Sequence, residues 1–292
     1  SENFTSIGSQ EFHENIFQSI LNLLNNPDFS SFSLSLISDL VSRIILAYSC
    51  SSDFDPNTFF FPFFLEIINS QNIENIQAAI NTLAYCIYNG SIDYHQLSDQ
   101  ISEFLNNVFT TENLSHEILL PSMRVLYLVF DSISFEFRSI LQDIFSQIKS
   151  NTELLNQSIH DIITYLPIEK YSFFDGNSSF FILYFTEILG TDELPNDLEY
   201  CSLEIIYNFS KVFYNDFSNN CELILDNIFL FLSNYETESK ESKFIISQIS
   251  QKYGATYTFS THCLDIFDNI LTKSSEENPN KLIAAMKLFS YC

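Results

Sequence analysis

Hydrophobic residues recur along this chain at intervals of three and four positions, which predicts amphipathic helices, and no stretch alternates as a strand would. The segment NIENIQAAINTLAYCIYNG, residues 72–90, shows the pattern most clearly, with its aliphatic positions on one helical face. Asn72 can cap its first turn and Gly90 can end it in a left-handed conformation. The segment NPNKLIAAMKLFSYC, residues 278–292, follows the same plan. The sequence therefore predicts an all-α fold.

Helix follows helix along the whole chain, and only the segment 167–177 falls outside the pattern. Helices are expected near residues 10–25, 34–49, 58–69, 73–89, 94–108, 115–132, 135–149, 153–166, 178–189, 197–213, 217–233, 238–253, 260–272 and 279–291. Paired in order, they form about seven two-helix units with a period of about 42 residues, as in HEAT and armadillo repeats. We expect one continuous right-handed α-α superhelix, a solenoid over residues 1–292, with an ordinary helical bundle as the alternative.

Composition excludes several classes of enzyme. The five glycines are too far apart for GxGxxG or GxxxxGK[ST], the phosphate-binding loops of nucleotide enzymes. The six cysteines include no CxxC pair, so we expect reduced thiols, in the cytosol or nucleus, rather than a zinc ribbon. No GxSxG turn presents a nucleophile. The neighbours His160 and Asp161 point about 100° apart on a helix, so they cannot bind one metal ion together. We expect no enzymatic activity, no cofactor and no metal site.

Charge points to the kind of partner. Twelve Lys and Arg against 37 Asp and Glu give a formal net charge of −25, which repels nucleic acids and anionic membranes and attracts basic proteins. No apolar run approaches the ~18 residues that a membrane span needs. We therefore expect a monomer that binds basic proteins, without nucleic acid or membrane insertion. We also expect the chain to be a segment of a longer protein.

Several stretches carry a family resemblance when they are read in order. SDLVSRIILAYSC precedes the acidic turn SSDFDPN and FFPFFLEIINSQNIENIQAAINTLAYCIYNG; HDIITYLPIEKYSFFDGNSSFFILYFTEILG, LEYCSLEIIYNFSKVF and QISQKYGATYTFSTHCLDIFDNILTKSSEENPNKLIAAMKLFSYC follow. Together they resemble the HEAT repeats of the importin-β (karyopherin-β) family of nuclear transport receptors, most closely the karyopherin β3 branch. The resemblance implies a receptor that imports basic cargo, binds the small GTPase Ran and Phe-Gly nucleoporins, and shuttles between cytoplasm and nucleus.

Two features depart from the family. Its members often carry a long acidic insertion near the position of NYETESKESK, residues 234–243, and this segment is short and contains two lysines. The Trp residues that line the family's inner surface have no counterpart in a chain without Trp. Tyrosines would have to replace them in gripping cargo.

Candidate cargo-binding residues lie on the polar faces of the second helix of each pair, which would line the concave surface. Carboxylates pair with Lys and Arg, and Tyr rings accept cations on their faces. The candidates are Asp39, Glu74, Tyr85, Glu117, Asp131, Asp161, Glu199, Tyr200 and Tyr207. The alternative for each is an ordinary solvated face, because exposed ion pairs contribute only ~0–1 kcal/mol.

Aromatic residues surround much of two first helices, TFFFPFFLEI at 58–67 and SSFFILYFTEIL at 178–189. In the resembling receptors, grooves between such outer helices accept Phe-Gly repeats, which need shallow apolar slots. The alternative is ordinary packing between adjacent repeats. For the whole chain, the alternative function is a HEAT or armadillo scaffold outside nuclear transport.

Overall fold

The computed structural model describes most of the chain between residues 31 and 234. The described residues are 31–49, 55–68, 73–111, 115–134, 136–189 and 196–234, with 15, 19, 22, 247, 249, 251–252, 261, 263–266, 268, 283, 286–287 and 290. These residues form helices, turns and connecting segments and no strand, which confirms the all-α prediction. The chain divides into two compact units, 1–140 and 141–292. The single continuous superhelix stays a prediction.

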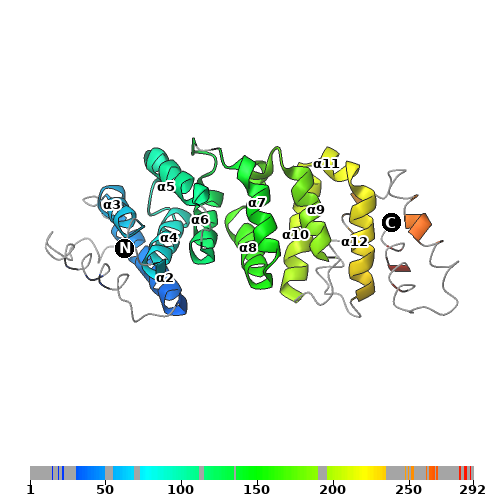
Figure 1. The fold of residues 1–292 in the computed structure, drawn as a ribbon, viewed down its shortest axis with the longest axis horizontal. Coiled ribbons are helices and arrows are strands. Elements are labelled where there is room, and N and C mark those ends of the chain that lie inside the picture. Colours follow the sequence, from blue (N-terminus) through cyan, green and yellow to red (C-terminus); the bar gives the residue numbers. More distant parts are fainter. Residues whose placement is uncertain are drawn as a thin grey trace. The chain divides into compact units, whose positions relative to one another are not determined.

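The first unit consists of paired helices (Figure 1). They are α2 (Ser31–Ser49), α3 (Pro56–Ile68), α4 (Ile73–Tyr88), the 3-10 helix η1 (Tyr94–Leu97), α5 (Ser98–Thr110) and α6 (His116–Val129). Helix α3 packs on α4, and α5 packs on α6, while α2, α4 and α6 pack side by side in one row. We call α2, α4 and α6 the second-helix row. Helix α4 has a neighbour on both flanks as well as its own partner α3, and most of its residues are buried.

The second unit holds the helices that follow. They are α7 (Arg138–Lys149, starting at the boundary), α8 (Thr152–Tyr165), the 3-10 helix η2 (Ile168–Phe174), α9 (Ser178–Leu189), α10 (Asn196–Val212), α11 (Tyr214–Asn219) and α12 (Cys221–Asn234). Helix α10 packs on both α8 and α9, and α12 packs on α9. Successive helix pairs are therefore neighbours in this unit as well.

The segment that the helical pattern left out, 167–177, belongs to the core of the second unit. Its 3-10 turns bury Tyr171, Phe173 and Phe174 completely. The Phe174 ring centroid lies 4.7 Å from that of Phe181 on α9 and 4.9 Å from that of Phe209 on α10. Aromatic rings at these spacings bury large apolar areas and stabilise one another. We call Tyr171, Phe173 and Phe174 the aromatic plug of the second unit. The sequence predicted only irregular chain for this segment.

The predicted helix bounds agree with the structure to within a few residues wherever both can be compared. Gly90 adopts φ +75°, as expected for the residue that ends α4. The helix predicted at 217–233 is instead two helices, α11 and α12, which meet at Asn220. The predicted helices at 10–25, 238–253, 260–272 and 279–291 and the acidic segment 234–243 fall almost entirely outside the described residues.

Side-chain hydrogen bonds connect residues about one period apart. On the second-helix row, Ser38 Oγ donates to the Ala78 carbonyl across 40 positions (3.1 Å), and Arg124 Nη1 donates to Asn81 Oδ1 across 43 (2.7 Å). In the second unit, Lys149 donates to Glu187 across 38 positions, Asn208 to the Tyr171 hydroxyl across 37, and Cys201 contacts His160 across 41. The observed separations bracket the period of about 42 expected for two-helix repeats.

None of the helices in the described part of the chain combines the length and the apolar character of a membrane span.

Candidate protein-binding surfaces

Asp161 does not face solvent as predicted. The residue is 4% exposed, and its carboxylate accepts a hydrogen bond of 3.2 Å from Gln157 Nε2. Helix α10 packs on α8, and the preceding residue His160 has its Nδ1 3.7 Å from Cys201 Sγ on α10. A helical wheel gives a second helix one buried face, but the neighbouring second helices cover its flanks as well. The predicted exposure of Asp161 is therefore wrong, and its role as a cargo contact stays a prediction.

Two other candidates already have a cation from their own helix. Arg43 Nε donates to Asp39 Oδ2 at 2.9 Å, and this bond raises the pKa of the Arg43 guanidinium. Lys211 Nζ lies 3.8 Å from the centroid of the Tyr207 ring, a cation-π contact. A basic ligand would have to compete with Arg43 at Asp39 and with Lys211 at Tyr207.

Glu117 and Asp131 are exposed, as predicted, but Glu117 lies in the first turn of α6 and Asp131 in the turn that follows Val129, its last residue. The helix rises about 18 Å between Glu117 and Val129, so one side chain of a ligand cannot contact both carboxylates. Glu117 accepts a hydrogen bond from the Ser115 hydroxyl, which lowers the pKa of its carboxyl group and keeps it charged. Tyr85 is half-buried on α4. The side chains of Glu74, Glu199 and Tyr200 lie outside the described part of the chain.

A serine and a histidine meet near Asp131 without forming a hydrolase triad. Ser132 Oγ lies 2.9 Å from His95 Nδ1, and Ser132 Oγ also donates to Asp131 Oδ1 at 3.4 Å. In a triad the carboxylate orients the histidine, whereas here it accepts from the serine. The structure also holds no group of three potential metal ligands among the residues that were described.

Two of the buried thiols are held in their unreactive form. Cys86, Cys201, Cys221 and Cys263 are all buried. Burial raises the pKa of Cys86 to about 12 and that of Cys221 to about 11. The thiolate is the reactive form of cysteine, so at neutral pH Cys86 and Cys221 behave as small apolar core residues.

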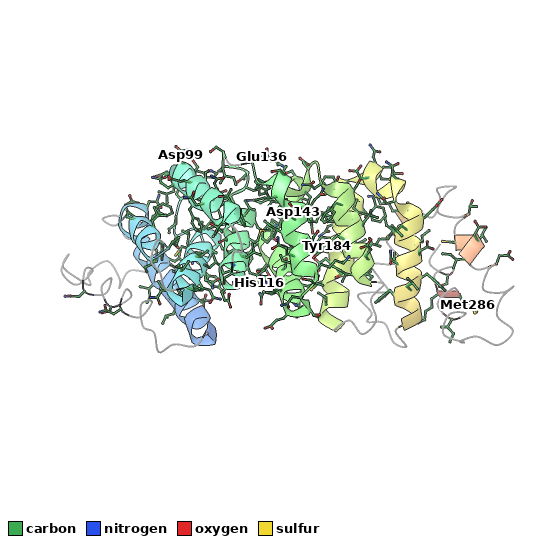
Figure 2. All side chains as sticks on the ribbon, in the orientation of Figure 1. Asp99, His116, Glu136, Asp143, Tyr184 and Met286 are labelled. Carbon is green, nitrogen blue, oxygen red and sulfur yellow. The ribbon has the colours of Figure 1, made fainter. Side chains whose placement is uncertain are left out.

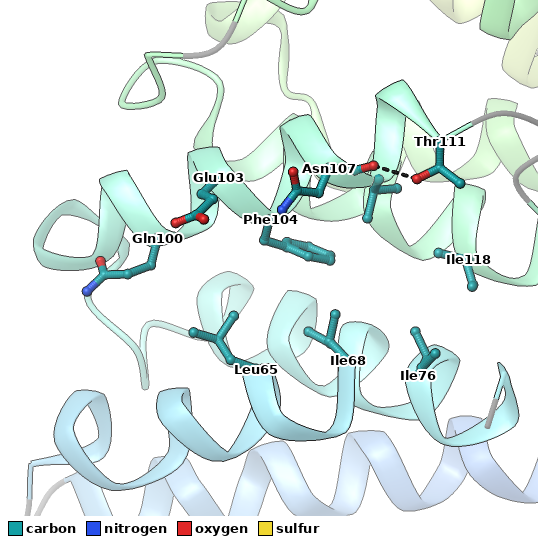
Figure 3. A pocket seen from close by; sticks show the side chains of 10 residues that line it. Leu65, Ile68, Ile76, Gln100, Glu103, Phe104, Asn107, Thr111 and Ile118 are labelled. Carbon is teal, nitrogen blue, oxygen red and sulfur yellow. Dashed lines mark hydrogen bonds between the residues drawn. The ribbon is translucent and has the colours of Figure 1, made fainter. Parts of the chain in front are cut away.

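A groove of about 390 Å³ lies in the first unit, between the first helices α3 and α5 (Figure 3). Leu65 and Ile68 come from α3, Ile76 from α4 and Ile118 from α6; Gln100, Glu103, Phe104, Asn107, Val108 and Thr111 come from the α5 side. Phe104 points from α5 toward the aliphatic side chains of α3. The apolar residues line the bottom, while Gln100, Glu103, Asn107 and Thr111 are exposed at the rim.

Sequence reasoning did not single out this groove, because it assigned ligands to second helices and only aromatic slots to first helices. The signal was present in α5. Gln100, Phe104 and Val108 follow one another at intervals of four, and so do Glu103, Asn107 and Thr111. Residues four apart share a helical face, so these two rows run side by side. One row is mainly apolar and the other is polar, which is the pattern of a lined groove with a hydrophilic edge.

The part of the sequence that forms most of this groove contains acidic residues and no Lys or Arg. Between Arg43 and Arg124 the chain contains nine Asp and Glu and no Lys or Arg. Arg43 is bound to Asp39, and Arg124 donates to Asn81. This stretch contains all of α3, α4 and α5. The excess of carboxylates in this stretch creates a local field that attracts cations.

Comparison with models of protein families, with curated proteins and with solved structures finds no match to this chain.

Proposed function

We propose that this chain is a protein-binding segment of HEAT repeats from an importin-β-like nuclear transport receptor that binds basic cargo. The observation that supports it best is the repeat of contacts about 40 residues apart, from Ser38–Ala78 to Asn208–Tyr171. Stacked helix pairs leave long solvent-facing helix surfaces, which proteins of this architecture use to bind other proteins. A curved superhelix formed by these pairs belongs to the same proposal.

Basic cargo follows from the charge. The net charge is −25, and the stretch from Asp53 to Glu117 contains nine Asp and Glu and no Lys or Arg. Both features favour a cationic partner. Complementary charge raises the rate of encounter and selects among partners. Binding should therefore weaken as salt rises.

Ran, Phe-Gly nucleoporins and shuttling between cytoplasm and nucleus are the part of the proposal that rests on the family resemblance. The receptor hypothesis requires that Ran in its GTP form release the basic ligand. The alternative is a HEAT or armadillo scaffold outside nuclear transport, in which Ran has no effect on the same ligand.

The experiment compares the two functions directly. The full chain is titrated with a Lys- and Arg-rich peptide in fluorescence anisotropy, alone and with Ran loaded with GTP or with GDP. A receptor segment binds the peptide and loses it to the GTP form but not to the GDP form. Peptide binding that neither form of Ran changes supports the scaffold. Absence of peptide binding at low salt contradicts both the receptor hypothesis and its basic ligand.

A further inference from the structure

We propose that the basic partner binds in the groove between α3 and α5, an inference that rests on the proposed function. A short segment of the partner would place apolar side chains between Leu65, Ile68 and Phe104 and keep Lys or Arg at the rim. This assignment differs from the sequence prediction, which put cargo on the second helices and left the outer surface to neutral Phe-Gly repeats.

The shape of the groove fits a short peptide. Its α5 side extends from Gln100 to Thr111, which is about 16 Å along the helix at 1.5 Å per residue. An extended peptide of about five residues covers that length. The half-exposed Leu65, Ile68, Ile76 and Ile118 offer apolar area that a bound side chain would remove from water. The groove is therefore long enough for two apolar side chains of one extended segment.

The charge selects a basic segment over a neutral or acidic one. Glu103 stands exposed at the rim. The stretch between Arg43 and Arg124 contains eight further Asp and Glu. No Lys or Arg occurs from residue 44 to residue 123 to compensate these charges. Asn107 and Thr111 add exposed polar groups along the same edge.

The second-helix row offers less to the same ligand. Asp39 is held by Arg43, while Glu117 lies in the first turn of α6 and Asp131 in the turn that follows its last residue. A ligand there would meet carboxylates that already bind a cation or lie far from one another, whereas the groove joins Glu103 to an apolar lining. The groove combines both kinds of contact in one place, so it is the better site for a segment with both kinds of side chain.

The test uses the full chain and synthetic seven-residue peptides. The main probe has two Phe separated by Ser, with two Lys at each end. One control peptide replaces both Phe with Ser, and the other replaces all four Lys with Ser. Isothermal titration calorimetry at low salt should show the main probe binding at least about tenfold more tightly than either control, because apolar burial and charge act together.

Matched variants locate the site. Leu65→Ser with Ile68→Ser should weaken the main probe about tenfold or more, since each lost side chain removes apolar contact. The control is Leu40→Ser, an exposed leucine on α2 in the same unit, which should change little. Glu103→Lys should weaken the probe about fivefold or more at low salt, compared with a small change for Asp143→Lys, an exposed carboxylate on α7 (Figure 2). Circular dichroism checks that each variant folds.

Each outcome decides something different. If the main probe binds and the groove variants bind it as well as the wild type does, the groove assignment is wrong while a basic partner stands. If the neutral Phe peptide binds as tightly as the main probe, the groove is a neutral aromatic slot, and the basic occupant is overturned. If the Phe-free Lys peptide binds equally well, bulk charge alone attracts it. If no peptide binds, the proposed basic partner fails together with its site.

Discussion

Arg124 on α6 donates a 2.7 Å hydrogen bond to Asn81 Oδ1 on α4, 43 positions earlier in the chain. Asn81 is 6% exposed, so its carbonyl oxygen needs a partner inside the protein. The guanidinium provides one across the joint between two helix pairs. This polar contact thereby joins one helix pair to the next.

Replacing Arg124 tests whether this contact stabilises the joint. Arg124→Met keeps much of the aliphatic stem but removes the donor, and we expect the free energy of unfolding in urea to fall by about 1–3 kcal/mol. Arg43→Met is the control, because Arg43 binds an exposed carboxylate on its own helix. It should have little effect. Equal losses from the two variants would contradict a special role for Arg124.

The aromatic plug of the second unit predicts a larger effect. Phe174 is fully buried, and its ring contacts those of Tyr171, Phe181 and Phe209. Phe174→Ala should therefore lower the free energy of unfolding by about 3–5 kcal/mol, through lost burial and the cavity left behind. The half-buried Phe180 on the adjoining helix serves as the control, and Phe180→Ala should cost clearly less. The reverse order would mean that the segment 168–174 is not core.

Tyr171 predicts how stability depends on pH. Burial raises the pKa of its hydroxyl from 10.0 to about 12, while the hydrogen bond from Asn208 acts in the opposite direction. Its contribution is fully present below pH 10 and is lost as pH rises toward 12, because the unfolded chain releases the proton first. Between pH 8.5 and 11.5 the wild type should lose about 2 kcal/mol more than Tyr171→Phe in urea unfolding. Parallel losses in the two proteins would contradict the pKa shift.

The second-helix row gives a prediction about binding. If a basic segment binds between α3 and α5, changes on the second-helix row should matter little. The double variant Asp131→Lys with Tyr85→Ala should bind the Lys- and Phe-containing peptide at most about twofold more weakly than the control variant Asp143→Lys does. Calorimetry at low salt measures the difference. A tenfold loss would instead return the cargo site to the surface that the sequence predicted.

The sequence predicted the helices well because their signals are local. The apolar spacing of 73–89 and the left-handed Gly90 depend only on neighbouring residues, and both agree with α4. The segment 167–177 falls outside the helical pattern, yet Tyr171, Phe173 and Phe174 are buried. Their burial depends on α9 and α10, which no local pattern reveals.

The candidate site was harder to predict because exposure depends on neighbours. Asp161 lies on the polar side of its own helix, yet the structure buries it. Asp39 and Tyr207 are placed correctly on partly exposed surfaces, but the sequence analysis did not pair them with Arg43 and Lys211 at the next helical turn. The groove between α3 and α5 needed two helices brought together from different repeats. Helix periodicity predicts each helix separately and does not predict how the two helices pack together.

The claim that this chain binds basic protein segments is tested most directly by one salt titration. The affinity of the full chain for a Lys-rich peptide carrying two Phe is measured by calorimetry from about 50 to 500 mM salt, a range over which exposed charges become screened. We expect binding that weakens steeply with salt but persists at the highest concentration, because the two Phe rings of the peptide stay buried in the groove. Absence of binding at 50 mM, or an affinity that does not change with salt, would contradict it.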